Sequence, residues 1–342
     1  MEDTSATDHG YETMGSGSAP FEPPSAAELV DLAARDDIRL TENEAAELVQ
    51  VVARLVEAAG RALDVEGDLP VARPTDRDPG HRPSPEENPH NAFVRRCEIA
   101  GTATGPLAGR TVAVKDNISV AGVPTTNGSR MPAYTPDLDA VVVERILAAG
   151  GTIVGKLNMD DMAAAGTGET SAFGPARNPM NPAHSAGGSS GGSGAVVAAG
   201  EADLSLGVDQ GGSGRIPAAF CGVVGVKATH GSVPSFGVAH IDHTIDSVTP
   251  IAATVADAAL LLDVIAGEDW RDPQWARGVV ESPPCADAAT EDLAGLRVGI
   301  IRESCDARLC VPAVVAGVHR AADALAAAGA QTEKITIPIW AN

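Results

Sequence analysis

The chain has 342 residues, which is long enough to bury a full α/β core in one large domain or two smaller ones. Its formal net charge is −22, from 46 acidic residues against 24 Lys and Arg, and only four of the basic residues are lysines. Such an acidic surface repels nucleic acid and anionic membranes, so we expect neither as a partner. The lysine-poor, acid-rich composition favours a halophile over an ordinary acidic protein, because salt would screen the self-repulsion.

The five cysteines are irregularly spaced and include no CxxC pair. This pattern argues against a disulfide framework and against a zinc site. No apolar stretch reaches the roughly 18 residues of a membrane span, and the acidic, polar start of the chain is unlike a secretory signal. We therefore expect a cytoplasmic protein without a metal or another cofactor.

Composition divides the chain into four parts. Residues 1–25 are rich in Gly, Ser, Thr, Pro and acidic side chains, which predicts a disordered tail. Residues 26–66 have helical periodicity, and residues 67–90 contain six prolines and many charges, which is typical of a linker. The remaining part, 91–342, alternates between strand and helix patterns.

Two capping boxes predict where the N-terminal helices begin. Ser25 and Glu28 have the spacing of the first box, and Thr41 and Glu44 have that of the second. The resulting helical hairpin could cover the core or mediate dimerisation, and the sequence does not decide between the two.

The alternation in residues 91–342 predicts a mixed β-sheet covered by helices on both faces. Strands are predicted at 111–114, 152–154, 297–301 and 331–339, with a short strand between the two glycine-rich segments at 187–194 and 209–217. Helices are predicted at 139–149, 193–199, 215–220, 254–265 and 311–328.

The two glycine-rich segments, GGSSGGSG at 187–194 and DQGGSGRIP at 209–217, contain the candidate chemistry. A serine hydroxyl becomes a nucleophile only with a base in hydrogen-bond reach, and the oxyanion that forms needs aimed N–H donors. The two glycines before Ser213 permit a tight turn that points successive N–H groups into one concavity. Ser213 also precedes a predicted helix, whose N-terminus adds positive potential.

Three lysines could supply the base. Lys115, Lys156 and Lys227 each follow a run of apolar residues, so each could end a buried strand. Burial lowers a lysine pKa because the charged form is desolvated, which leaves a neutral amine able to accept a proton. Local context does not choose among the three.

Together with the segment AVKDN at 113–117, the two glycine-rich segments resemble the amidase signature family, whose members cut amide bonds with a Ser-Ser-Lys triad. The resemblance covers about residues 91–340. It implies that Lys115 is the base, that Ser189 follows a cis peptide bond and relays the proton, and that Ser213 is the nucleophile.

The same resemblance implies roles around the nucleophile. Backbone N–H groups from Gln210 to Ser213, with Gly211 and Gly212 between them, would form the oxyanion hole, and the Gln210 side chain would bind the substrate amide. Apart from the resemblance, the opposite charges of Asp209 and Arg215 predict that the two side chains pair and hold the loop, which is a structural role.

Two positions in this loop differ from other members of the family. The family normally has an aliphatic residue after the nucleophile, whereas this chain has Gly214, which would loosen the turn. Many members have threonine at position 210. The glutamine of this chain resembles instead the residue found there in the amidases that work beside nitrile hydratases.

Other motifs favour structural roles. The segment GGSSG also fits the G-x-S-x-G elbow of α/β-hydrolases, but no strand is predicted directly before it. Ser190 and Ser193 are predicted to cap a helix, and Cys221, after an apolar stretch, to be a buried inert thiol. His240 and His243 lack further ligand residues nearby, which favours structural histidines over a metal site.

The resemblance therefore implies an amidase that converts a carboxylic acid amide into a carboxylate and ammonia. Its partners would be a small-molecule amide substrate and a second copy of the chain in a homodimer. The alternatives are the transamidase subunit of a glutamyl- or aspartyl-tRNA amidotransferase, and an inactive fragment, because family members usually continue for another hundred residues or more.

Overall fold

The computed structural model describes residues 23–63, 76–272, 285, 293–306, 308 and 310–341. Most of the predicted tail at 1–25 and the first part of the predicted linker lie outside these ranges. The chain divides into two compact units, Met1–Val71 and Ala72–Asn342.

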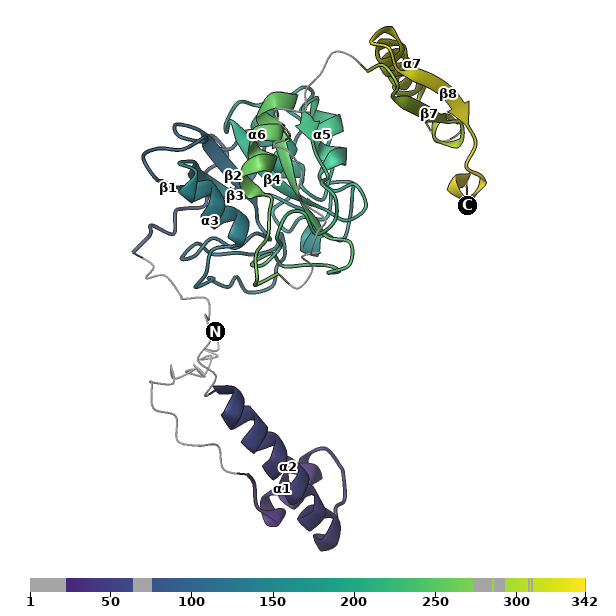
Figure 1. The fold of residues 1–342 in the computed structure, drawn as a ribbon. Helices are drawn as coiled ribbons and strands as arrows, with labels where there is room; N and C mark the ends of the chain where they lie inside the picture. Colours follow the sequence, from purple (N-terminus) through teal and green to yellow (C-terminus); the bar gives the residue numbers. More distant parts are fainter. Residues whose placement is uncertain are drawn as a thin grey trace, which may run out of the picture. The chain divides into compact units, whose positions relative to one another are not determined.

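The first unit is a hairpin of two helices, α1 (Ala26–Arg35) and α2 (Glu42–Leu63), drawn in purple and dark blue in Figure 1. Both predicted capping boxes are present. Ser25 N–H donates to the Glu28 carboxylate at 2.7 Å and Glu28 N–H donates to Ser25 Oγ at 3.3 Å, and Thr41 and Glu44 repeat this exchange. The boxes satisfy N–H groups that the first helical turn leaves unpaired, which explains why the helices begin here.

The second unit contains a six-stranded mixed sheet in the order β1-β3-β2-β4-β6-β5. The central strand β2 is parallel to β3 and to β4, whereas β1, β5 and β6 pair in antiparallel fashion. The strands are β1 (Phe93–Ile99), β2 (Thr111–Lys115), β3 (Thr152–Leu157), β4 (Leu204–Asp209), β5 (Val224–Gly225) and β6 (Ser247–Ala252).

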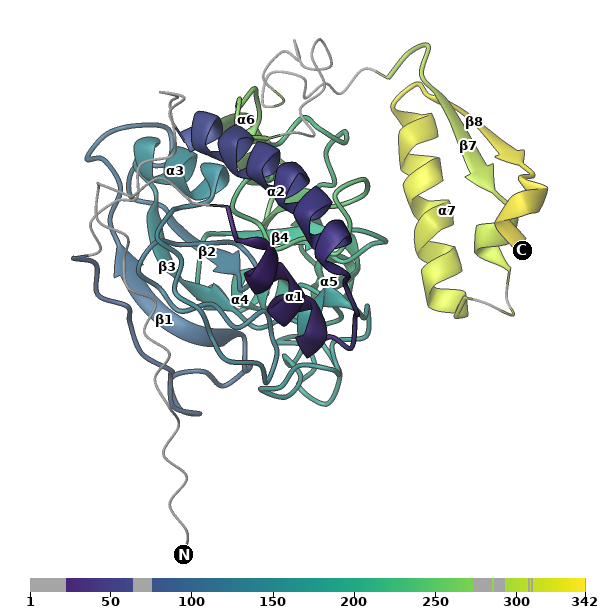
Figure 2. The same cartoon turned by 90° about the horizontal axis from the view of Figure 1, so that it is seen from below.

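Helices cover both faces of this sheet, which confirms the predicted architecture (Figures 1 and 2). One face packs against α3 and α6, and the other packs against α4 and α5. The helices are α3 (Val141–Ala148), α4 (Gly191–Ala198), α5 (Arg215–Cys221) and α6 (Val255–Ile265).

The alternation of β2 decides which face receives its terminal lysine. Val112 and Val114 belong to the core beneath α3 and α6, whereas Ala113 belongs to the core beneath α4 and α5. Because successive side chains of a strand point to opposite faces, Lys115 lies on the face of Ala113. This is the face that α4 covers, and α4 begins within the first glycine-rich segment, at Gly191.

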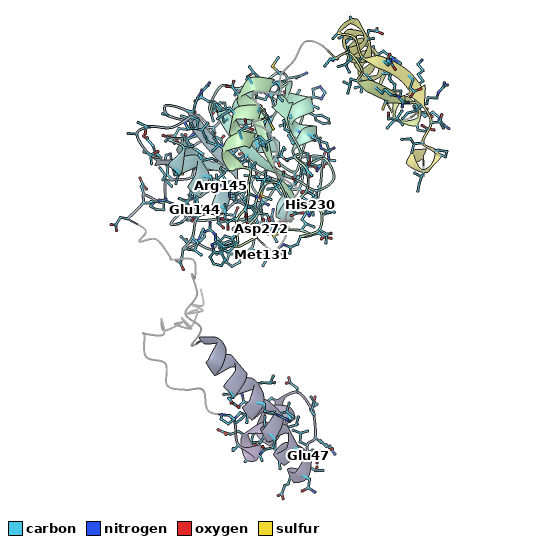
Figure 3. The ribbon with its side chains drawn as sticks, in the orientation of Figure 1. Glu47, Met131, Glu144, Arg145, His230 and Asp272 are labelled. Carbon is cyan, nitrogen blue, oxygen red and sulfur yellow. The ribbon has the colours of Figure 1, made fainter. Side chains whose placement is uncertain are left out.

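Polar contacts from α3 hold the segment that follows α6. Arg145, labelled in Figure 3, donates to the carbonyl oxygens of Ile265 at 2.7 Å and Gly267 at 3.2 Å. Its neighbour Glu144 forms an ion pair with Arg271 at 2.7 Å. These contacts satisfy carbonyl groups that the end of a helix leaves unpaired.

The described part of the predicted linker, residues 76–90, belongs to the second unit and contacts its sheet and loops. Arg77 binds the buried carboxylate of Asp139 with two hydrogen bonds of 2.7 and 2.9 Å, and His81 forms a β-bridge with Arg96 of β1.

Neither β1 nor β6 was predicted from the sequence.

The C-terminal part forms a βαβ unit of β7 (Arg297–Ile301), α7 (Pro312–Ala327) and β8 (Gln331–Ile335), whose two strands are parallel. The last strand is shorter than the predicted 331–339, because a 3-10 helix at Pro338–Ala341 follows it and proline has no N–H for a strand ladder. None of the helices in the described ranges is long and apolar enough to span a membrane.

Candidate active site

The first predicted site residue, Lys115, ends β2 and is fully buried. Its Nζ lies 2.7 Å from Ser189 Oγ and 3.3 Å from the carbonyl oxygen of Val208. The structure thus brings together two residues that are 74 positions apart in the sequence.

The environment of Lys115 favours a neutral amine. Burial lowers its pKa from 10.5 to about 7, and the negative charges of Asp160, Asp246 and Asp209 only partly oppose this shift. Near neutral pH, a substantial fraction of Lys115 can therefore accept a proton from the serine that it contacts.

The other two candidate lysines have different partners. Lys156 is also fully buried, but its Nζ lies 2.7 Å from Thr125 Oγ1, 3.1 Å from the Asp116 carbonyl oxygen and 3.2 Å from Asp116 Oδ1. Lys227 donates to the carbonyl oxygen of its neighbour Ala228. In the described ranges neither lysine has a hydrogen bond to a serine of the glycine-rich segments, so the geometry favours Lys115 as the base, which stays a prediction.

Ser189 begins the turn that leads into α4. The peptide bond between Gly188 and Ser189 is cis, as the resemblance implied. The Ser189 carbonyl oxygen accepts a 3.0 Å hydrogen bond from Asp160 N–H. A side chain at Gly188 would overlap the Asp160 carboxylate, so the close approach of this turn to Asp160 requires glycine.

The second glycine-rich segment is organised by Asp209, the last residue of β4. Its carboxylate accepts hydrogen bonds from the N–H groups of Gly212 at 2.8 Å and Gly214 at 3.2 Å, and from the side chain of Arg215 at 2.9 Å. Burial alone would raise the Asp209 pKa, but these hydrogen bonds outweigh it and the pKa is lowered. The buried carboxylate thus holds the turn that contains Ser213.

The two segments meet through their backbones. Ser190 N–H donates to the Ser213 carbonyl oxygen at 3.1 Å, and Ser213 is only 7% exposed. Within the described part of the chain the Ser213 hydroxyl makes no hydrogen bond, so the step from Ser189 to Ser213 is open in this state. Catalytic hydrogen bonds often close only when substrate binds.

The predicted oxyanion donors divide into two groups. Gly212 N–H donates a hydrogen bond to the Asp209 carboxylate, whereas the N–H groups of Gln210 and Gly211 have no protein acceptor in the described ranges. The space next to Gly211 is open. These two N–H groups therefore remain candidates to bind an oxyanion, and Gly212 serves to hold the turn.

The Gln210 side chain has unused hydrogen-bonding capacity. Both its Oε1 and its Nε2 are buried without a hydrogen-bond partner in the described part of the chain. Because burying an unsatisfied amide is costly, a ligand group that pairs with both atoms would gain binding energy. This matches the predicted role in substrate binding, which stays a prediction.

The structure corrects one structural assignment and confirms another. Neither Ser190 nor Ser193 caps α4. Their hydroxyls donate to carbonyl oxygens of β4, at Val208 and Leu206 respectively, because both are buried against that strand. Cys221 is buried, and burial raises its pKa to about 11, so its thiol is inert as predicted.

The two histidines that suggested a metal site stack on each other. The ring centroids of His240 and His243 are 4.0 Å apart. The described ranges contain no group of three or more His, Cys, Asp or Glu side chains that could hold a metal ion.

Asp160, which was not predicted from the sequence, contacts the turn of Ser189 and the segment that contains Gly168 and Thr170. Its buried carboxylate accepts hydrogen bonds from the N–H groups of Gly168 and Thr170, both at 2.9 Å, and its charge opposes the lowering of the Lys115 pKa. Its position in the sequence could have identified it, because Asp160 lies three residues after β3 and polar residues that follow a parallel strand gather at one edge of the sheet.

The fold is α/β, and it brings a buried lysine into hydrogen-bond contact with a serine of the first glycine-rich segment, as the family resemblance implied. A model of the Amidase family matches residues 84–341, and the chain belongs to this family, the amidase signature enzymes that act on carbon–nitrogen bonds.

Relatives give a more specific likeness. The chain is 51% identical over 250 residues to the A subunit of glutamyl-tRNA(Gln) amidotransferase from Natronomonas pharaonis, covering 73% of this chain and 59% of that one. It is also 51% identical to the protein of the same name from Halobacterium salinarum, covering 72% and 58%. The halophilic relatives support in part the inference drawn from the acidic composition.

A solved structure gives the same likeness. The crystal structure of the glutamyl-tRNA(Gln) amidotransferase A subunit from Thermotoga maritima matches with a TM-score of 0.69 and 36% identity, covering 73% of this chain and 55% of that one. The chain thus spans less than three-fifths of the length of each of these relatives.

These relatives overturn the predicted partners. A small amide and a second copy of the chain, without nucleic acid, were expected, whereas the relatives are named as one subunit of an enzyme for a tRNA. The expectation was wrong because net charge describes the average surface and gives no information on single contacts. Gln210 was likewise a poor guide, because it favoured the nitrile-pathway amidases over the alternative that these relatives support.

Proposed function

We propose that this chain carries the amide-cleaving site of a glutamyl-tRNA(Gln) amidotransferase, in the role of its A subunit. It would release ammonia from a carboxamide such as glutamine, for transfer to a glutamyl-tRNA bound with other subunits. The observation that carries the proposal is the 2.7 Å contact between Lys115 Nζ and Ser189 Oγ. The 51% identity to a relative of that name supports the choice of acceptor.

The proposed reaction proceeds through an acyl-enzyme. Neutral Lys115 takes a proton from Ser189 as Ser189 takes one from Ser213, and Ser213 Oγ forms a bond to the amide carbon. The N–H groups of Gln210 and Gly211 stabilise the oxyanion. Ser189 then returns a proton to the nitrogen, the carbon–nitrogen bond breaks and ammonia leaves.

Water completes the cycle. It attacks the ester carbon as the lysine and serine relay accepts its proton, and the bond to Ser213 Oγ breaks. The products are a carboxylate and the regenerated serine. In this proposal Asp209 and Arg215 act on the turn, because their contacts are with the backbone and with each other.

The test combines the chain with the other subunits of the Natronomonas pharaonis enzyme in concentrated KCl. Glutamine and glutamyl-tRNA are supplied, and both ammonia and glutaminyl-tRNA are measured. We expect both products, and neither with Ser213→Ala. Lys227→Met is the matched control and should keep full activity, because in the described part of the chain Lys227 donates to a neighbouring carbonyl oxygen and not to a serine of the site.

Two results would contradict the proposal. Ammonia release that does not depend on Ser213 would show that Ser213 is not the nucleophile. Ammonia release that requires Ser213, but never yields glutaminyl-tRNA, would restrict the chain to amide hydrolysis with water as the acceptor.

A further inference from the structure

Gly214, directly after Ser213, is not explained by its backbone conformation. Its φ of −100° and ψ of −41° lie in the right-handed helical region, which any residue adopts. Its N–H donates to Asp209 Oδ2 at 3.2 Å, and its carbonyl oxygen accepts from Ala218 N–H at 3.3 Å. The reason for glycine must therefore lie in its surroundings.

A neighbouring strand fills the space where a side chain would be. A Cβ at position 214 would lie 2.5 Å from Cγ2, 2.7 Å from Cβ and 2.9 Å from Oγ1 of Thr249. All three distances are too short for carbon contacts, and Thr249 is fully buried in β6, where it pairs with Gly207 of β4. Because Thr249 is enclosed, it cannot move away to make room.

A second strand also lies close to Gly214. A Cβ at Gly225 of β5 would lie 3.1 Å from the Gly214 carbonyl oxygen. Gly214 thus lies close to both β5 and β6, which pair with each other, and Thr249 of β6 fills the space where a side chain of residue 214 would be.

We propose that Thr249 is a positioning residue for Ser213. Its side chain occupies, from β6, the volume that an aliphatic residue after the nucleophile would occupy from the turn itself. Contact with Thr249 confines Gly214, and with it the adjacent Ser213, although glycine alone would permit many conformations. The inference rests on the proposed function only in taking Ser213 as the nucleophile.

Position 214 has glycine where the family normally has an aliphatic residue, and the contact with Thr249 explains how this chain accommodates the difference. A glycine there was expected to loosen the turn. The Thr249 side chain fills the space beside Gly214, so the turn stays closely packed. The residue tolerated at one of the two positions therefore depends on the residue at the other. Either change alone should disturb Ser213, and the exchange of both should restore it.

The test measures how fast a fluorophosphonate probe modifies Ser213 in the full chain, detected by mass spectrometry of the labelled peptide. Gly214→Ile should slow labelling at least about tenfold, because the new side chain overlaps Thr249. Thr249→Gly should slow it about threefold by leaving a hole. The double variant should recover to within about twofold of the original chain.

A second pair of variants keeps the test decisive if Gly214→Ile fails to fold. Thr249→Val retains the volume but loses the hydroxyl, which donates to the Ser247 carbonyl oxygen at 3.3 Å. It should label at the original rate, whereas Thr249→Gly should not, with both variants shown to be folded by their thermal transitions. A merely structural role would change melting without changing the labelling rate of folded molecules.

Three outcomes would overturn the inference. They are an unchanged rate in Gly214→Ile, a double variant no faster than the slower single variant, and a slow Thr249→Val with a fast Thr249→Gly. Labelling that persists in Ser213→Ala would instead refute the nucleophile, so failure of the proposed function is recognised separately.

Discussion

Two buried lysines lie on neighbouring strands at the centre of the second unit, and they differ in almost everything except burial. Lys156 of β3 pairs in register with Val114 of β2, so it faces α3 and α6, whereas Lys115 faces α4. Lys156 has Asp116 beside it, and its Nζ donates to Thr125 Oγ1 and to the Asp116 carbonyl oxygen and lies 3.2 Å from the Asp116 carboxylate. Lys115 has a serine and one carbonyl oxygen.

The comparison shows that burial alone does not make a lysine a base. Burial lowers the pKa of both side chains, but at Lys156 the nearby Asp116 carboxylate opposes the shift most strongly. No carboxylate contacts Lys115 in the described ranges, and the aspartates that favour its charged form act only from a distance. A catalytic amine needs the first property, desolvation, without the second, an ion-pair partner.

Replacing each lysine with methionine should separate these roles most strongly. Lys115→Met should reduce the rate of ammonia release on the order of 10³-fold, because the serine relay loses its base. It should cost only about 1–3 kcal/mol of stability, since the two buried hydrogen bonds of Lys115 are lost. Steady-state kinetics and denaturant unfolding of the same sample check both numbers, and a large loss of stability would contradict the neutral state.

Lys156→Met should show the opposite pattern. The change leaves the fully buried Asp116 carboxylate without its cation, which should lower the free energy of unfolding by about 3–5 kcal/mol. The double variant Lys156→Met/Asp116→Leu should recover part of that loss, because no buried charge remains. If Lys156→Met instead unfolds like the original chain, the ion pair has no structural role.

The pH dependence should reflect Lys115. Its pKa is lowered to about 7, and only the neutral amine accepts a proton. The value of kcat/KM should therefore fall about tenfold per pH unit below pH 7 and level off above it. A profile that still rises with full slope above pH 9 would show that the lysine keeps its ordinary pKa.

Removing a distant charge should have the smallest effect. Asp160 is the carboxylate that most strongly raises the Lys115 pKa against the effect of burial. In Asp160→Asn this support for the ammonium form is lost, so the pKa should fall further. The acid limb of the kcat/KM profile should move to lower pH by less than about one unit. A move to higher pH would contradict the assigned charge effect.

The sequence predicted the parts of the molecule whose signals are local. The capping boxes at Ser25 and Thr41 and the strand at 297–301 depend on neighbouring residues, and the structure confirms them. The strands β1 and β6 were missed. β1 (FVRRCEI) contains three charged residues, and β6 (SVTPIA) contains a proline, so neither has the usual strand pattern.

Contacts between distant segments limited the prediction of the site. Lys115 and Lys156 could not be separated from local context, because the sheet register that points them to opposite faces is set by pairing across β2 and β3. The family resemblance supplied the choice, and the contact with Ser189 agrees with it. The contact between Gly214 and Thr249 joins positions 35 residues apart, and no local pattern indicates it.

The most direct test of the account is the protonation state of Lys115, measured by NMR on the chain labelled with ¹³C at the lysine Cε. Only four lysines are present, so few signals arise, and Lys115→Met identifies the relevant one. The account predicts that this signal titrates at about pH 7. Titration near the ordinary value of about 10.4 would show that Lys115 is an ammonium group at neutral pH and would contradict its role as the base.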